Sequence, residues 1–240
     1  MPTNSILSIR PDYELVTRYA ASWMIQVLNA STIPVVDLYE SQATASNFFN
    51  ALETQDPLVV NILGHGGYNI ITCQNDEALL REGINTNVLV ERVVYDLSCR
   101  AGRDLGRTAF NEGAISFLGY REDFWMCYSN GNHSDGGMVN PLADEVSRGF
   151  FESHNIAPIS YLQGSTVSDS YYASQNKSNY WINVWEQIDS QVAALLVWNR
   201  DYQVLHGEGA PVPGAGIGPA LLMFAPLLLI PILKKKKKFK

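Results

Sequence analysis

Apolar residues in this chain alternate between short runs typical of β-strands and longer stretches with helical spacing. The short runs are rich in Val, Ile and Leu and are bounded by small or polar residues, as buried strands are. Five strands are predicted in this way, at 5–9, 33–38, 58–63, 93–97 and 114–118. Because near-continuous apolar strands need cover on both faces, we expect them to form a mostly parallel sheet.

The stretches between these strands have helical periodicity. Pairs of apolar residues recur every four positions from Leu15 to Leu28, which predicts an amphipathic helix over 12–29. Further helices are predicted at 44–54, 104–111, 141–153 and 167–198, with a break open inside the last. Residues 76–89 are expected to mix loop and short helix, 129–137 to form a turn-rich loop, and 159–162 to form an edge strand or loop. Strands separated by helices predict a doubly wound α/β domain with flanking helices.

The C-terminal part of the chain has a different character. Residues 209–233 carry no charge, and six lysines follow within 234–240. About 20 apolar residues in a helix cross the hydrocarbon layer of a bilayer, and flanking lysines are typical of its boundary. The sequence therefore predicts a folded domain over 1–208 and a transmembrane or sorting segment over 209–240, through which the protein contacts a membrane.

The charge pattern of this tail predicts an orientation. Lysines favour the cytoplasmic side, which puts the folded domain on the outer face of the membrane, at the cell surface. The N-terminus shows no secretory signal, so the cytoplasmic face stays open as the alternative. The run from Pro213-Gly214 through the apolar stretch to the basic end also resembles prokaryotic C-terminal sorting signals, in which the tail is cleaved.

Charge and cysteine content narrow the classes of function. The formal net charge is −7, and subtracting the six tail lysines leaves about −13 on the rest of the chain (−7 minus 6), which argues against a nucleic-acid partner. The three cysteines form no CxxC pair, so neither a disulfide framework nor a structural zinc site is expected. We expect no metal and no cofactor.

The candidate chemistry lies at the ends of two predicted strands. Gly64-His65-Gly66 follows strand 58–63, and Ser98-Cys99 follows strand 93–97. Reacting groups gather at the carboxyl ends of parallel strands, where an imidazole beside a thiol can take its proton. His65 and Cys99 are therefore the predicted catalytic residues. The backbone N–H groups of Gly66 and Cys99 are the predicted donors to a developing oxyanion.

These segments resemble the caspase-fold cysteine peptidases, nearest to the gingipain-type and CHAT-domain group. The motifs that carry the resemblance are Gly64-His65-Gly66, Leu97-Ser98-Cys99-Arg100-Ala101-Gly102 with Leu105-Gly106, the strand over 113–120, and residues 162–173. The resemblance covers roughly residues 5–208. It implies a caspase-like sheet and a cysteine endopeptidase, or a related acyl transferase, in which Cys99 attacks a peptide carbonyl and His65 protonates the leaving amine.

The same resemblance raises a question of specificity. Many members of the group prefer a basic residue before the cut, and some carry an aspartate two places before the cysteine. Leu97 stands at that place here, and Asp96 lies three places before Cys99. Asp96, Glu122 and Asp123 are the acidic candidates for the substrate pocket, and preference for a basic residue is the hypothesis that they support.

Two alternatives stay open beside the peptidase. A transamidase would use the same dyad and pass the acyl group to an amine. A catalytically silent caspase-like module would serve as a surface or signalling scaffold, with loop 129–137 across the cleft. Cys73 and Cys127 are expected to be structural or incidental. The intact dyad favours a membrane-anchored cysteine endopeptidase that acts on peptide or protein substrates.

Overall fold

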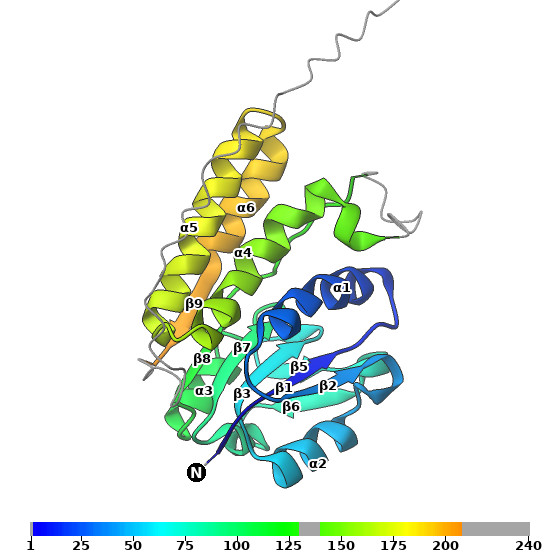
Figure 1. Ribbon diagram of the computed structural model, residues 1–240, viewed down its shortest axis with the longest axis vertical. Coiled ribbons are helices and arrows are strands. Elements are labelled where there is room, and N and C mark those ends of the chain that lie inside the picture. Colours follow the sequence, from blue (N-terminus) through cyan, green and yellow to red (C-terminus); the bar gives the residue numbers. More distant parts are fainter. Residues whose placement is uncertain (1, 130–139, 208–240) are drawn as a thin grey trace, which may run out of the picture.

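The computed structural model describes residues 2–129 and 140–207, which form a six-stranded sheet in the order β2–β1–β3–β7–β8–β9 (Figure 1). The strands are β1 Thr3–Arg10, β2 Val35–Tyr39, β3 Pro57–Leu63, β7 Val93–Leu97, β8 Ser116–Tyr120 and β9 Gln203–His206. The first five are parallel, and β9 runs antiparallel to β8 at the edge. The predicted α/β class with a mostly parallel sheet is confirmed.

Helices cover both faces of this sheet (Figure 1). They are α1 Leu15–Ala30, α2 Ala45–Gln55, α3 Leu105–Asn111, α4 Glu145–Leu162, α5 Val167–Glu186 and α6 Ser190–Tyr202. The short 3-10 helices are η1 Glu40–Gln42, η2 Gln74–Asp76, η3 Thr86–Leu89 and η4 Pro141–Ala143. Helices α1 and α4 pack on one face of the sheet, and α2 and α3 pack on the other. Helix α5 packs against α4, and α6 packs against α5.

Burial on both faces explains the apolar strands. All seven residues of β3 are buried. Val60 and Ile62 point into the core shared with α2 and α3, whereas Val59 and Leu63 belong to clusters on the α1 and α4 face. Because successive side chains of a strand point to opposite faces, a strand that is covered twice must be apolar throughout.

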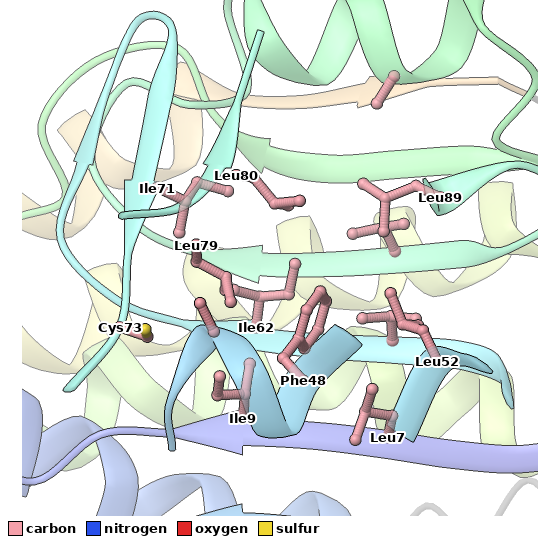
Figure 2. Close-up of a cluster of buried hydrophobic side chains, with 14 of the residues drawn as sticks. Leu7, Ile9, Phe48, Leu52, Ile62, Ile71, Cys73, Leu79, Leu80 and Leu89 are labelled. Atoms are coloured by element: carbon pink, nitrogen blue, oxygen red, sulfur yellow. The ribbon is translucent and has the colours of Figure 1, made fainter. Parts of the chain in front are cut away.

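A small antiparallel sheet lies beside the main one, and the sequence pattern did not predict it. Its strands are β4 Gly66–Gly67, β5 Ile70–Thr72 and β6 Ala78–Arg81, so residues 76–89 contain a strand as well as the short helix η3. Figure 2 shows Ile71, Leu79 and Leu80 lying over the cluster that Phe48 fills from α2. Cys73 is buried in the same cluster, and burial raises the pKa of its thiol to about 12, which fits a structural role.

The C-terminal half differs from the expectations at two places, and it shows where the helix predicted over 167–198 breaks. Residues 159–162 lie inside α4, so the expected edge strand or loop there is wrong. The edge position belongs instead to β9, where no strand was predicted. The predicted helix over 167–198 is broken into α5 and α6, and the side chain of Asp189 accepts backbone N–H bonds at the start of α6.

A buried polar network connects the end of the sheet to α4 and α5. His154 is fully buried, and its Nδ1 lies 3.2 Å from the hydroxyl of Tyr120. Gln203 donates both to that hydroxyl and to Ser174 Oγ, 2.9 Å away. Because a charged imidazole loses its hydration in this position, burial lowers the pKa of His154 to about 3.

Within the described residues, no helix combines the length and the apolar character needed to cross a bilayer. The predicted membrane segment over 209–240 and all but the first residue of loop 129–137 lie outside the described residues.

Substitution of His154 is expected to change the acid stability of the fold. The folded pKa of about 3 lies below the ordinary 6.5, so unfolding takes up a proton and stability falls as the pH drops from 6.5 toward 3. In His154→Leu this loss between pH 7 and pH 4 should shrink by on the order of 2–3 kcal/mol, measured by denaturant unfolding. Tyr120→Phe disturbs the same network without removing the imidazole, so this variant should still lose stability between pH 7 and pH 4 as the unchanged protein does. An unchanged pH dependence in His154→Leu would contradict this account.

Candidate active site

The pairing of β3 with β7 determines where the two candidate catalytic residues lie. The strands pair in register from Val59 with Val93 to Leu63 with Leu97. His65 and Cys99 each lie two residues beyond the last pair, so both follow strands that end at the same edge of the sheet. Both line a single cavity, and the predicted meeting of the two strand ends is therefore present in the structure.

This cavity opens between α1, the ends of β3 and β7, residues 124–126 and α4. Most of its wall is apolar and comes from Val16, Ala20, Leu63, Leu97, Phe124, Met126 and Phe151. None of the described hydrogen bonds joins the Cys99 thiol to the His65 ring. Catalytic hydrogen bonds are often long before substrate binds and tighten in the complex, so the lack of this bond is compatible with a His65/Cys99 pair.

The imidazole of His65 is held by a carboxylate that the sequence reasoning missed. Its Nε2 lies 2.8 Å from Glu14 Oε1, and each side chain is about two-fifths exposed. Glu14 directly precedes α1, and the ring of Tyr13 contacts the imidazole edge-on with centroids 6.1 Å apart. This contact at Nε2 leaves Nδ1 as the nitrogen available to exchange a proton with a thiol. The signal for Glu14 was its place just after the first strand, whose carboxyl end adjoins that of β3.

The electrostatics of Cys99 favour a neutral thiol. Burial is the largest cause of its raised pKa, and the charges of Asp123 and Asp96 act in the same direction. The backbone amide of Phe124 and the charge of Arg100 oppose them without cancelling them. A thiol of this kind needs a base as it attacks, because little thiolate is present beforehand.

Close packing explains the glycines that flank His65. A Cβ on Gly66 would lie 2.1 Å from the carbonyl oxygen of Cys99, and one on Gly64 would lie 1.9 Å from the carbonyl oxygen of Thr72. Any larger residue at either position would push the backbone away. The Gly-His-Gly sequence thus lets the imidazole-bearing segment fit between β5 and the backbone of Cys99.

Within the described part of the chain, the N–H groups of the two predicted oxyanion donors, Gly66 and Cys99, make none of the described hydrogen bonds. Thr72 N–H donates to His65 C=O at 2.8 Å, which makes residues 65 and 72 a hydrogen-bonded pair. The next pair, Gly66 with Ile71, is then a non-hydrogen-bonded pair, and the N–H of Gly66 points away from β5. None of the described hydrogen bonds uses the N–H of Cys99 as its donor.

The three acidic candidates lie outside the cavity wall. Asp96 is fully buried, accepts a 2.7 Å hydrogen bond from Ser98 Oγ, and has its pKa raised to about 8 by burial. Asp123 pairs with Arg100 at 2.6 Å, and Glu122 contributes its backbone carbonyl to the N–H of Arg100. The structure therefore does not gather these carboxylates around the space that His65 and Cys99 share.

Helix α6 holds the segment that forms one wall of the cavity. Trp125 N–H donates to Asn199 Oδ1 at 2.9 Å, and Asn199 Nδ2 donates back to the carbonyl of Trp125 at 2.7 Å. The indole of Trp198 donates to the carbonyl of Asp123. A side-chain amide thus satisfies both backbone groups of Trp125 and fixes the neighbouring Phe124 and Met126.

Among the residues that the structure describes, no group of three or more His, Cys, Asp or Glu side chains is arranged to hold a metal ion. No protein-family model matches the chain, and no curated protein matches it.

The raised pKa of Cys99 predicts a pH profile for its alkylation. In a Cys73→Ala/Cys127→Ala background, the rate of iodoacetamide labelling at Cys99 should still be rising above pH 9, because the thiolate fraction grows until the pH passes the raised pKa. Mass spectrometry over pH 6–10 would measure it. A plateau reached below pH 8 would instead indicate a thiolate–imidazolium pair.

Two neighbouring glycines offer a matched test of the site's packing. Gly66→Ala places a methyl group against the backbone of Cys99 and should lower the rate of active-site labelling by at least about ten-fold. In Gly67→Ala the new methyl group meets only the side chain of Ile70, at 3.2 Å, so the labelling rate should stay within about two-fold. Equal rates in the two variants would show that the approach of Gly66 to Cys99 does not matter.

Proposed function

We propose that this chain is a cysteine endopeptidase with a caspase-like domain that works through an acyl-enzyme. One observation carries the proposal: His65 and Cys99 line the same cavity at the carboxyl ends of two adjacent parallel strands, and Glu14 holds the imidazole. The sheet order, with the histidine after β3 and the cysteine after its neighbour β7, supports the caspase-like assignment.

The geometry suggests how each group takes part. The sulfur of Cys99 attacks the carbonyl carbon of a peptide bond while its proton passes to Nδ1 of His65. The N–H groups of Gly66 and Cys99 are the donors for the oxygen that becomes negative. When the C–N bond breaks, the proton on His65 goes to the leaving amine. Water then attacks the thioester, His65 takes a proton from it, and the carboxylic acid leaves as the thiol is restored.

Glu14 has a positioning role in this mechanism. The carboxylate accepts the Nε2 hydrogen and thereby favours the tautomer in which Nδ1 can act as a base. It also stabilises the imidazolium that forms after proton transfer. This stabilisation of the imidazolium by Glu14 matters because the raised pKa of Cys99 keeps its thiol protonated, so the proton has to move during the attack itself.

We further propose that residues 209–240 attach this domain to a membrane, with the domain on its outer face. The support for this part is the uncharged stretch over 209–233 and the lysines that follow it.

Three variants test the peptidase. Cys99→Ala should abolish hydrolysis of a mixed peptide library, and Glu14→Gln should lower kcat at least about ten-fold and shift the pH profile, since the imidazolium loses its counter-charge. Glu145→Gln alters an exposed carboxylate on α4 and should leave the kinetics unchanged.

The outcomes separate the candidate functions. Hydrolysis that survives Cys99→Ala would refute the proposal. Absence of selective labelling at Cys99 would favour a silent scaffold, and product formation only with an added amine would favour a transamidase.

A further inference from the structure

Among the residues that the structure describes, those that line the cavity beside Cys99 offer a substrate no free charge apart from the His65–Glu14 pair at its mouth. Its two hydroxyl groups already have acceptors within the protein: Thr17 Oγ1 donates to the carbonyl of Glu14 at 3.2 Å, and Ser98 Oγ donates to Asp96. Apolar side chains form the rest of its wall, among them Ala20, Leu63 and Met126. The described part of the wall therefore favours an apolar group.

The size of the cavity limits which apolar side chains fit into it. Its volume is about 50 Å³. On the scale on which one water needs about 10–15 Å³, it holds about four water-sized groups. The four carbons of a leucine side chain, or the unbranched chain of methionine, match that number.

The position of the cavity indicates which part of a peptide enters it. The side chain of the residue whose carbonyl is attacked branches from the carbon next to the reacting carbon. Cys99 is itself part of the cavity wall, so this side chain is the one nearest to the opening when the sulfur reaches the carbonyl.

We propose that the enzyme selects an aliphatic residue such as Leu or Met immediately before the cut, and not a basic or acidic one. The inference rests on the proposed function and names its substrate class. An arginine or aspartate side chain in this space would lose its hydration without gaining a partner. The three acidic candidates do not change this, because Asp123 is paired with Arg100 at 2.6 Å, Asp96 has no exposed surface, and Glu122 does not line the cavity.

Peptidyl acyloxymethyl ketones that differ only in the residue next to the reactive carbon would test the inference. On the full chain, the rate of Cys99 modification should be at least about 100-fold higher for the Leu and Met probes than for the Arg, Lys and Asp probes. A faster Arg, Lys or Asp probe, or equal rates for all, would overturn the aliphatic selection and leave the peptidase proposal in place. If no probe modifies Cys99, the proposed function itself fails.

A matched pair of surface variants makes the test sharper. Val16 lies on the cavity wall and is 41% exposed, so Val16→Asp should fold, slow the Leu probe at least about ten-fold and speed the Arg probe. Val90 is 40% exposed and lies outside the cavity, so Val90→Asp should leave both rates unchanged. Unchanged rates in Val16→Asp would count against the cavity as the side-chain pocket.

A variant that changes the size of the cavity, and not its charge, provides a second test of the pocket. Met126→Ala enlarges the space and should move the preference from Leu toward Phe. A folded Met126→Ala protein that keeps the Leu preference would contradict the assignment, and the Val16 pair decides the question if the Met126 variant does not fold.

Discussion

The unbroken register between β3 and β7 is the constraint on which the site depends. Side chains alternate across a sheet, so a slip of one residue would carry Cys99 to the face opposite His65. Both strands are buried on both faces, and such a slip would also move every apolar side chain of β7 into the wrong cluster. The packing that holds the sheet together thus also fixes the relation between the imidazole and the thiol.

Two properties of the site have a single cause in this packing. The wall that α1, α4 and residues 124–126 build around Cys99 is apolar, and the same wall removes water from the thiol. Loss of hydration raises the pKa of Cys99, and the same apolar wall is the basis of the proposed selection for an uncharged side chain. Glu14 stands at the exposed mouth, where its charge can act on His65 without the cost of burial.

Much of this arrangement follows from local sequence. The strands β1, β3, β7 and β8 are visible as apolar runs because they are buried on both faces, whereas β2 lies at the edge and is only partly buried. The meeting of His65 and Cys99 follows from the common edge at which parallel strands end. The small sheet β4–β5–β6 was not predicted because its strands of two to four residues are too short to show an alternating pattern of apolar and polar residues. Strand β9 was missed because its edge position depends on a partner, β8, that lies more than 80 residues away.

The remaining differences also come from contacts distant in sequence. Residues 159–162 (Ile-Ser-Tyr-Leu) form a short apolar run like that of a strand, yet they belong to α4, which continues through Pro158. Glu14 reaches His65 only because β1 lies beside β3. Asp123 forms an ion pair only because the fold brings Arg100 within reach of it. Spacing along the chain contains none of this information.

The hydrogen bonds between Asn199 and Trp125 have a consequence for how the chain can be divided. Residues 2–120 supply five of the six strands and both members of the dyad, and so look like a self-sufficient unit. One wall of the cavity nevertheless depends on a helix near residue 199. A fragment that stops after α4 would keep Cys99 and lose the support beside it, so the shortest fragment that keeps this wall of the cavity extends at least to the end of α6. Circular permutants should likewise keep α6 joined to the sheet.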